Sequence, residues 1–254
     1  MSDKKEAIVV QNISKIFGTL KVLDNVSMEI YKGETFVILG GSGSGKSTML
    51  RIMAGGIKPT SGKVYFDGTD LSTLKERDAE KIKRRFGMSF QSSALMDFLT
   101  VEENVSLPLR EHTTLDKSII NIISKMKLGL VGLQGFEDYY PSQLSGGMKK
   151  RVGLARAIAM DPEVVFYDEP TAGLDPVVCA VIDKLILDLT KKLKLTSVVV
   201  THNMESVFRI ADRVAMLYRG NLLQVGTPEE IKNSNDPIIK QFINGEIEGP
   251  IQLT

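Results

Sequence analysis

A glycine-rich stretch at residues 40–48 has the composition of a loop that binds phosphate groups. It reads GGSGSGKST and matches the pattern G-x-x-x-x-G-K-[ST]. Glycines let successive backbone N–H groups curl around phosphate oxygens, and the N-terminus of a following helix adds positive potential. In this pattern Lys46 reaches the β- and γ-phosphates, and the Ser47 hydroxyl ligates Mg²⁺. The predicted nucleotide-binding residues of the loop are Gly40, Gly41, Ser42, Gly43, Ser44, Gly45, Lys46, Ser47 and Thr48.

The residues on either side of this loop support the same interpretation. A strand-like apolar run ends at Leu39, and residues 48–54 have the pattern of a helix. A phosphate-binding loop requires this order of strand, loop and helix. The alternative is a flexible Gly/Ser linker, which would require neither flanking element.

Two carboxylates follow an apolar run in the second half of the chain. Residues 164–167 read VVFY, and Asp168 and Glu169 come directly after them. The carboxyl end of a parallel strand is where ligands bind in open α/β sheets. We therefore expect Asp168 to hold Mg²⁺ and Glu169 to polarise an attacking water molecule. By itself this pattern is more often a plain strand end, and it gains weight from the phosphate-binding loop.

The elements that would position these groups alternate between strands and helices. Residues 72–85 are heavily charged and predict an exposed helix, whereas residues 91–160 indicate a mostly helical insert. Thr100 and Glu103 fit a helix-capping box at the start of that insert. Near-continuous apolar strands predict a parallel sheet covered on both faces. Strand-like runs occur at residues 8–10, 26–30, 36–39, 63–66, 86–90, 164–167 and 197–200.

The composition is that of a globular protein and excludes several function classes. The chain has 254 residues, with 32 basic and 31 acidic side chains and a net charge of +1. This balance argues against a protein held on nucleic acid by counterion release, so we expect no nucleic-acid partner. No apolar run approaches the roughly 18–20 residues that span a bilayer. The single cysteine, Cys179, excludes an internal disulfide, fits a reducing compartment and is expected to be buried.

A string between the two candidate half-sites resembles a family motif. Residues 144–148 read LSGGM and resemble the signature of ATP-binding-cassette (ABC) ATPases. Other motifs of that family follow in its order, namely Gln91 as the Q-loop, Ala172-Gly173-Leu174-Asp175 as the D-loop and His202 as the switch histidine. Phe17 stands where the family has an aromatic that stacks on adenine. The signature residues are Leu144, Ser145, Gly146, Gly147 and Met148.

The resemblance implies a fold class and a division of the chain. The expected fold is an α/β P-loop ATPase core with a mainly parallel sheet, an N-terminal antiparallel β subdomain and an inserted α-helical subdomain. We expect one ABC domain over residues 1–254. Its parts are the core with the β subdomain (1–90), the helical subdomain with the signature (91–160), the remaining core with the Asp-Glu strand and switch histidine (161–230) and a C-terminal tail (231–254).

The resemblance also implies how the site works. The cofactors would be ATP and Mg²⁺, with Glu169, His202 and Gln91 catalytic and with Ser47, Gln91 and Asp168 at the metal. Two copies of the chain would sandwich two ATP molecules head to tail in a C₂-symmetric arrangement. In such a dimer Ser145 and Gly147 of one copy would contact the γ-phosphate bound by the other copy. A separate membrane permease would be the partner, with this chain peripheral at the cytoplasmic face of the inner membrane.

Shorter strings resemble the ATPases of bacterial Mla-type lipid transporters, which work with MCE proteins. The strings are residues 90–95 (FQSSAL), residues 108–113 (PLREHT), Met148 in the signature and residues 241–250 (QFINGEIEGP). The similarity implies phospholipid transport between bacterial inner and outer membranes. It also implies a periplasmic MCE-type protein and a small regulatory subunit as partners.

Other functions stay open at this point. The chain could serve a transporter of a different substrate, or it could be a non-transport ABC ATPase that acts on ribosomes or DNA. Such non-transport members usually have two cassettes or a long coiled-coil insert, and neither is present here. An inactive regulatory subunit is disfavoured because the catalytic motif residues are all present.

Three positions depart from the commoner family pattern. Met148 stands where most signatures have Gln, Phe17 stands where Tyr is commoner, and Asn203 follows the switch histidine where Asp is commoner. Because Ser145 and the glycine amides remain, we expect nucleotide sandwiching to survive.

Several features have simple structural interpretations. The basic runs at residues 83–85 and 149–151 are expected to be solvated helix faces. An apolar stripe in the tail, Ile238, Ile239, Phe242 and Ile243, is expected to pack on its own domain. A further hypothesis is that residues beyond Phe242 reach a neighbouring subunit.

Overall fold

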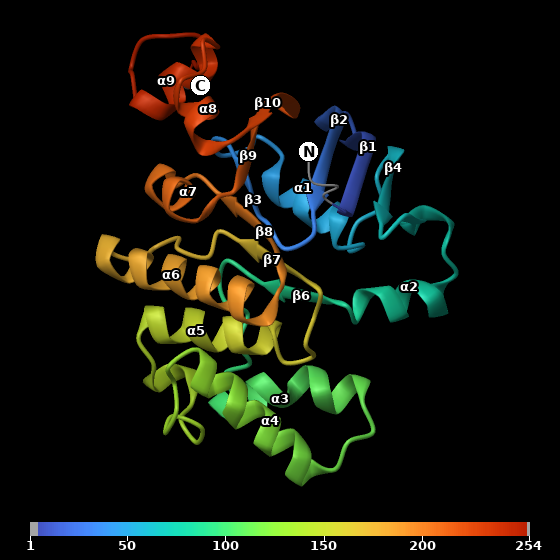
Figure 1. Ribbon diagram of the computed structural model, residues 1–254, viewed down its shortest axis with the longest axis vertical. Helices are drawn as coiled ribbons and strands as arrows, with labels where there is room; N and C mark the ends of the chain where they lie inside the picture. Colours follow the sequence, from blue (N-terminus) through green and yellow to red (C-terminus); the bar gives the residue numbers. More distant parts are fainter. Residues whose placement is uncertain (1–4, 253–254) are drawn as a thin grey trace.

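A computed structural model describes residues 5–252. Residues 1–4 and 253–254, the ends of the predicted single domain and of its tail, lie outside the described residues. The molecule is elongated: α8 and α9 lie at one end, α3 and α4 lie at the other, and a sheet lies between them (Figure 1). The chain alternates between strands and helices around that sheet, as the sequence predicts.

The central sheet has six strands in the order β10-β9-β3-β8-β7-β6. All neighbouring strands are parallel except β9 and β10, which form an antiparallel hairpin at one edge. The prediction of a mainly parallel sheet is therefore confirmed, although the sequence reading missed the β9–β10 hairpin. The strands are β3 (Thr35–Leu39), β6 (Phe86–Ser89), β7 (Val164–Asp168), β8 (Thr196–Thr201), β9 (Arg213–Tyr218) and β10 (Asn221–Gly226).

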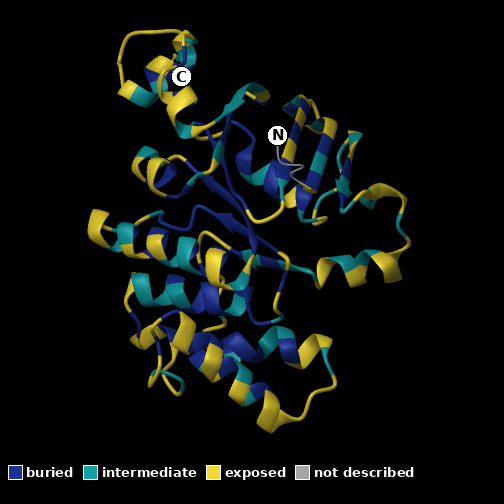
Figure 2. Ribbon diagram, in the orientation of Figure 1, coloured by how far each residue is buried: buried dark blue, intermediate teal, exposed yellow. Residues whose placement is uncertain are grey.

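Alternate residues of the central strands face two separate cores. In β3, Val37 and Leu39 pack into one apolar cluster, whereas Phe36 and Ile38 pack into another. Helices α3, α4, α5 and α6 contribute to the first cluster, and α1 with the second sheet contributes to the second. Figure 2 shows the central strands as the most buried part of the molecule. A sheet covered on both faces explains why β3 and β7 are apolar throughout.

The second sheet is antiparallel and has the strand order β2-β1-β4-β5. Its long first hairpin, β1 and β2, extends well beyond the apolar runs that the sequence shows. Polar residues interrupt the ends of these strands, which show no continuous apolar run in the sequence, so the sequence analysis missed the ends of both strands. The predicted antiparallel subdomain is confirmed. The strands are β1 (Glu6–Phe17), β2 (Leu20–Tyr31), β4 (Ser61–Phe66) and β5 (Thr69–Asp70).

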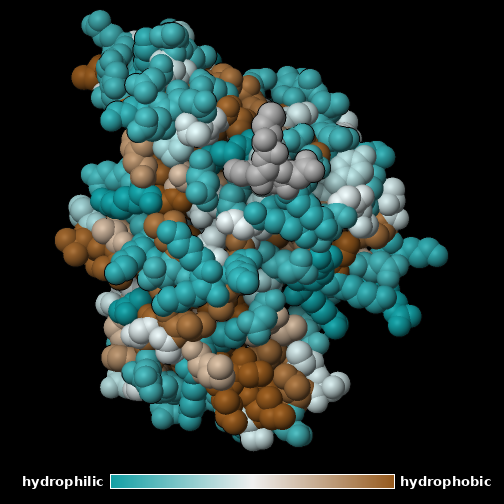
Figure 3. All heavy atoms as spheres, in the orientation of Figure 1, coloured by the Kyte–Doolittle hydropathy of each residue, from teal (hydrophilic) through white to brown (hydrophobic). Residues whose placement is uncertain are grey.

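Three helices inserted between β6 and β7 pack against one another as a separate group (Figure 1). Their exposed face carries an apolar stripe along α4 that includes Ile119, Ile122 and Met126, and Figure 3 shows apolar side chains gathered over this helix. The insert helices are α3 (Val101–His112), α4 (Lys117–Leu130) and α5 (Gly146–Ala157), with a 3₁₀ turn at Pro141–Gln143.

Two predicted helical stretches are shorter than expected. Residues 72–85 split into a 3₁₀ turn (Leu71–Thr73) and α2 (Glu76–Lys83), because the Asp70 carboxylate accepts hydrogen bonds from the Ser72 N–H and hydroxyl and closes a local turn. Residues 91–99 form turns rather than helix. The buried Asn104 amide holds them by bonding the Met96 N–H and carbonyl and the Leu99 carbonyl.

The remaining helices flank the central sheet and close the chain. In α9 the Ile239 side chain is fully buried, and Phe242 and Ile243 pack against the same core, so the tail stripe packs on its own domain. The Gln241 amide bonds the backbone of Ile251 and folds the last described residues back onto α9. The helices are α1 (Lys46–Met53), α6 (Pro176–Leu193), α7 (Met204–Ile210), α8 (Pro228–Lys232) and α9 (Pro237–Asn244).

Candidate nucleotide site

The glycine-rich loop connects β3 to α1 and lies against the second sheet. Gly45 caps α1 with a φ of 100°. A Cβ atom at this position would lie 2.7 Å from Leu23 Cδ2 and 2.8 Å from the Val22 carbonyl oxygen, so only glycine fits. The buried Ser44 hydroxyl within the loop has no hydrogen-bond partner among the described residues. Backbone N–H groups around an unpartnered hydroxyl at a helix N-terminus suit a phosphate ligand.

Lys46 is folded back across this loop. Its ammonium donates a hydrogen bond of 2.9 Å to the Gly41 carbonyl and lies 3.9 Å from Oε1 of Glu169. Burial lowers the pKa of Lys46, and the carboxylates of Glu169 and Asp168 act in the opposite direction. The structure therefore places a buried cation between the predicted phosphate cradle and the predicted catalytic carboxylate.

Ser47 and Asp168 lie together although they are 121 residues apart in the chain. The Ser47 hydroxyl donates to Oδ1 of Asp168 at 2.8 Å. Both come from the same edge of the parallel sheet, because α1 begins just beyond β3 and Asp168 ends β7. A hydroxyl and a carboxylate oxygen are hard ligands that suit Mg²⁺, which usually takes one or two protein carboxylates with phosphate oxygens and water.

Within residues 5–252 no group of three or more His, Cys, Asp or Glu side chains is placed to hold a metal ion. The hydroxyl of Ser47 and the carboxylate of Asp168 are donors that suit a cation which also binds phosphate oxygens.

Glu169 stands in an unusual backbone conformation. Its φ of 48° lies in the left-handed region, which costs energy for a residue with a Cβ and is found most often at functional sites. The residue is 7% exposed, and its Oε1 lies 2.9 Å from Nδ1 of His202. Its Oε2 has no hydrogen-bond partner among the described residues. This oxygen is available to accept a hydrogen bond from a ligand or a water molecule.

His202 reaches Glu169 from the neighbouring strand. β8 lies between β3 and β7, and His202 follows its last residue. The side chain is 62% exposed, while the next residue, Asn203, caps α7 by accepting from the Ser206 N–H. His202 therefore contacts the buried carboxylate of Glu169 and is also exposed to solvent.

Gln91 and Asp168 line one cavity of about 530 Å³ at this edge of the sheet. Gln91 itself is exposed in the turn after β6. The structure thus brings the predicted Q-loop residue to the side of the Ser47–Asp168 pair. The cavity is lined by Arg51, Phe90, Gln91, Ser92, Ala94, Asp168, Ala172 and Gly173.

The signature motif lies elsewhere in the chain. Ser145 caps α5 by accepting from the Met148 N–H, and a Cβ on Gly147 would lie 2.8 Å from Val178 Cγ1 at the start of α6. Asp175 caps α6 by accepting from the Val177 and Val178 N–H groups, so the signature and the D-loop are neighbours.

A single chain does not join the signature to the phosphate loop. Helices α1 and α5 pack into the two different cores on opposite faces of the sheet. Over residues 5–252, no hydrogen bond or ion pair connects residues 144–148 with residues 40–48. Within one chain, the signature motif therefore does not contribute to the phosphate loop.

Phe17 ends β1 with 46% of its surface exposed. The Lys15 ammonium lies 4.7 Å from the centre of its ring. The exposed ring face fits the predicted stacking role.

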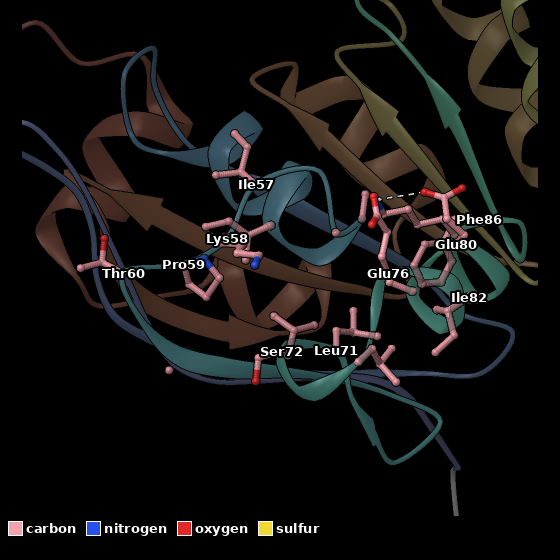
Figure 4. A pocket seen from close by; sticks show the side chains of 18 of the residues that line it. Ile57, Lys58, Pro59, Thr60, Leu71, Ser72, Glu76, Glu80, Ile82 and Phe86 are labelled. Atoms are coloured by element: carbon pink, nitrogen blue, oxygen red, sulfur yellow. Dashed lines mark ion pairs between the residues drawn. The ribbon is translucent and has the colours of Figure 1, made fainter.

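A second cavity, of about 550 Å³, lies at the other end of α1, between β4 and α2 (Figure 4). An ion pair between Lys83 and Glu80 lies at its edge, at 3.7 Å. The C-terminus of α1 faces this region, and the helix dipole there disfavours an anion. None of the predicted site residues lines it.

Sequence reasoning was wrong about Lys150. The run at residues 149–151 is predicted to be solvated, but Lys150 is 7% exposed and donates to the Gln91 carbonyl at 2.6 Å and the Glu169 carbonyl at 3.2 Å. Its buried neighbours at helical spacing, Leu154 and Ala157, are the signal that could have placed it on the inner face of α5.

Comparisons with known proteins point to one family. The chain matches the ABC transporter family over residues 23–172. It is 41% identical to the intermembrane phospholipid transport system ATP-binding protein MlaF of Haemophilus influenzae, over 97% of this chain and 93% of that protein. It is 40% identical to the probable ribonucleotide transport ATP-binding protein mkl of Mycobacterium leprae, over 98% of this chain and 72% of that protein.

Solved structures show the same fold. The ATP-binding cassette MJ0796, in a dimeric post-hydrolysis state bound to ADP and Pi, superposes with a TM-score of 0.79 and 34% identity, over 87% of this chain and 98% of that one. The structure of cbiO1 from Clostridium perfringens, part of an ABC transporter complex, superposes with a TM-score of 0.83 and 28% identity, over 96% of each chain. Because the family match covers residues 23–172 and relatives 40–41% identical cover nearly all of the chain, the chain belongs to the ABC transporter family and is an ABC ATPase.

Proposed function

We propose that this chain powers a phospholipid transporter whose membrane-spanning part is a separate protein. The observation that carries the proposal is the convergence of Lys46, Ser47, Asp168, Glu169 and His202 at one edge of the sheet. These groups are the ones that ATP hydrolysis requires: a cation for the phosphates, oxygen ligands for a metal and a carboxylate for water.

Each side chain has a role that its surroundings support. The loop amides and Lys46 bind the β- and γ-phosphates, and Phe17 stacks on the adenine ring. Glu169 accepts a proton from the attacking water through its unpartnered Oε2. His202 holds the other carboxylate oxygen and so orients the base. The Lys46 ammonium lies 3.9 Å from that same oxygen.

Ser47, Asp168 and Gln91 would hold Mg²⁺ with the phosphates. When bound, the ion neutralises charge on the β- and γ-phosphate oxygens. The residues present fit it, because a hydroxyl and a carboxylate already meet at 2.8 Å and Gln91 lines the same cavity.

A second copy of the chain completes each site. The signature residues, including Ser145 and Gly147, contact the γ-phosphate that the other copy binds, and Asp175 lies beside this interface. The separation of α1 and α5 in one chain supports this arrangement, as do the dimeric structures of the related cassette MJ0796. The division into core (1–90 and 161–230), helical subdomain (91–160) and tail (231–254) fits the same scheme.

The membrane partner docks beside the Q-loop. Three exposed apolar side chains, Phe90, Met96 and Phe98, follow β6 next to Gln91, and Phe98 is 77% exposed. Exposed aromatic residues of this kind mark protein interfaces. No helix within residues 5–252 has the length and apolar character to cross a bilayer. With that partner, the chain acts at the cytoplasmic face of the inner membrane.

The phospholipid assignment rests on likeness to MlaF and on the short strings it shares with Mla-type ATPases. A periplasmic MCE-type protein and a small regulatory subunit would complete the assembly. A specific observation favours a second substrate class, since the equally similar mkl proteins are named for ribonucleotide transport.

Purification of the tagged chain from detergent-solubilised membranes of its own host tests the proposal. We expect a permease and an MCE-type protein to be recovered, and we expect Phe98→Ser to lose both while its ATP binding is kept. In the reconstituted complex, phospholipid should stimulate ATP turnover, and ribonucleotides other than ATP should not. Stimulation by ribonucleotides alone would replace the lipid assignment, and recovery of ribosomes without a permease would overturn the transport role.

A further inference from the structure

Lys150 is a buried cation whose hydrogen bonds go to main-chain carbonyls. It lies on the first turns of α5, five residues after the signature serine, and its ammonium bonds the carbonyls of Gln91 and Glu169. No ion pair within the described part of the chain involves it, whereas the other buried lysine of the helical insert, Lys127, pairs with the carboxylate of Asp161. Burial lowers the pKa of Lys150, with Glu169 acting in the opposite direction.

Burying a cation is costly unless polar groups replace its water. A methionine of similar length would fill the same space without this cost, so the packing of α5 does not require a lysine here. The two carbonyls that Lys150 binds belong to separate motifs that are 78 residues apart in the chain. The ammonium therefore connects three segments: the signature helix, the Q-loop and the end of β7.

The inner face of α5 makes further contacts of the same kind. Arg156 donates to the carbonyls of Ser93 and Ala94 at 2.5 and 2.7 Å. Between the two cations, Gly153 lets the loop approach closely, because a Cβ there would lie 3.3 Å from Ser93 Cβ. Positions 150, 153 and 156 follow one another at a spacing of three residues and lie along one side of the helix.

The carbonyls that these cations hold belong mostly to residues in the left-handed region. Ser93, Ala94 and Glu169 have φ values of 61°, 45° and 48°. Such conformations persist only where surrounding contacts over-determine them. In Glu169 the N–H donates to the Val200 carbonyl at 2.9 Å and the carbonyl accepts from Lys150, so both sides of the strained residue are held.

We propose that Lys150 is a positioning residue, which fixes the main chain of Glu169 and Gln91 to the signature helix. A movement of the Q-loop or of the signature helix would then be transmitted to the carboxylate that activates water. This inference rests on the proposed function of Glu169 as the general base. Lys150 itself need not touch the nucleotide.

Lys150→Met removes the donors and keeps the length of the side chain. In the purified full chain we expect kcat for ATP to fall by about 10- to 100-fold and the Kd for a fluorescent ATP analogue to change by less than about threefold, because a displaced base slows the chemical step and leaves the phosphate cradle intact. Lys150→Gln keeps an N–H donor and should lose less activity than Lys150→Met. Lys127→Met is the matched control, since it removes a buried lysine of the same subdomain that has no contact with the site.

Hydrogen exchange measured on the same proteins gives a readout that is independent of turnover. Lys150→Met should raise exchange in peptides that cover residues 89–95 and 167–173, and Lys127→Met should not. If Lys150 acts through Glu169, adding Lys150→Met to Glu169→Gln should slow hydrolysis no further.

The outcomes separate the two proposals. Normal turnover in Lys150→Met, unchanged exchange in these peptides or an equal loss in Lys127→Met would overturn the role of Lys150. Normal turnover in Glu169→Gln together with raised exchange in Lys150→Met would instead overturn the general-base role and leave the structural link in place.

Discussion

Among single residues, Glu169 has the surroundings that a general base requires. Its carboxylate is almost fully buried, one oxygen faces His202, and the other has no hydrogen-bond partner among the described residues. Its backbone lies in the left-handed region, with a φ of 48°. Asp168, the preceding residue, faces Ser47 instead, so two adjacent carboxylates serve two different partners.

Replacing the base should separate ATP binding from hydrolysis. In Glu169→Gln the amide keeps the shape of the side chain but accepts protons poorly. We expect hydrolysis to slow by roughly 10²- to 10⁴-fold while ATP binding is kept. Single-turnover hydrolysis and equilibrium ATP binding on the same preparation check this, and equal turnover in both proteins would remove Glu169 from the role.

Asp183 in α6 gives a prediction for the pH dependence of stability. Burial raises the pKa of this carboxyl, while bonds from Ser206 and Arg209 act in the opposite direction and the nearby Glu205 raises it further. Because its folded-state pKa lies above the unfolded value, the folded chain binds more protons in the interval between them. The contribution of Asp183 to stability is therefore lost as the pH rises through that interval.

Asp183→Asn removes this titration. The free energy of unfolding of the wild type, minus that of the variant, should decrease as the pH rises above about 4, the ordinary pKa of an Asp side chain. Urea unfolding at several pH values measures the difference. A difference that is constant across this range, or that increases with pH, would contradict the prediction.

At the scale of elements, local capping decides where the functional helices begin. Ser145, Asp175 and Asn203 each cap a helix that starts within or beside a site motif. Their side chains bond backbone N–H groups that would otherwise be unpaired. Such helix starts can be predicted from the sequence, because the capping side chain and the N–H group that it bonds are at most three residues apart.

The capping box of α3 offers a test away from the site. Thr100 accepts from the Glu103 N–H at 3.2 Å, and Glu103 accepts from the Thr100 N–H at 2.8 Å. We expect Thr100→Ala to lower the free energy of unfolding by about 1 kcal/mol, whereas Thr114→Ala, an exposed control in the loop after α3, should change it by less than about 0.5 kcal/mol. Equal effects in chemical denaturation would show that the box does not stabilise the fold.

At the scale of the whole molecule, the two halves of the proposed site lie on helices that pack on opposite faces of the sheet. In the arrangement that we propose, a second copy brings its signature motif to the phosphates bound by the first. The C₂ symmetry that results gives two equivalent sites from one repeated contact.

The dependence of this dimer on the signature can be measured. Glu169→Gln with Mg-ATP should sediment as a dimer, because hydrolysis no longer releases it. Adding Ser145→Arg to Glu169→Gln should change the Kd for ATP by less than about threefold. The double variant should stay monomeric, because the bulky cation blocks the helix cap that faces the partner's nucleotide. A dimer that forms equally well with Ser145→Arg, or a Glu169→Gln protein that stays monomeric at saturating Mg-ATP, would contradict the shared site.

The sequence alone determined the phosphate loop, the Asp-Glu strand end and the signature, because each is a contiguous string whose chemistry depends on neighbouring residues. It also determined the alternation of strands and helices, since burial on one or both faces leaves a local pattern. The strings that belong together in the family were found in order, and the fold class that they imply is confirmed.

Only the tertiary structure decided which distant groups meet. Lys150 belongs to a basic run that predicts a solvated surface, yet it is buried against two carbonyls from other elements. The β9–β10 hairpin and the turns at residues 91–99 were likewise missed, because pairing partners and the Asn104 side chain decide them. The physical reason is common to all three: desolvation and hydrogen bonding depend on neighbours in space, which a linear pattern does not record.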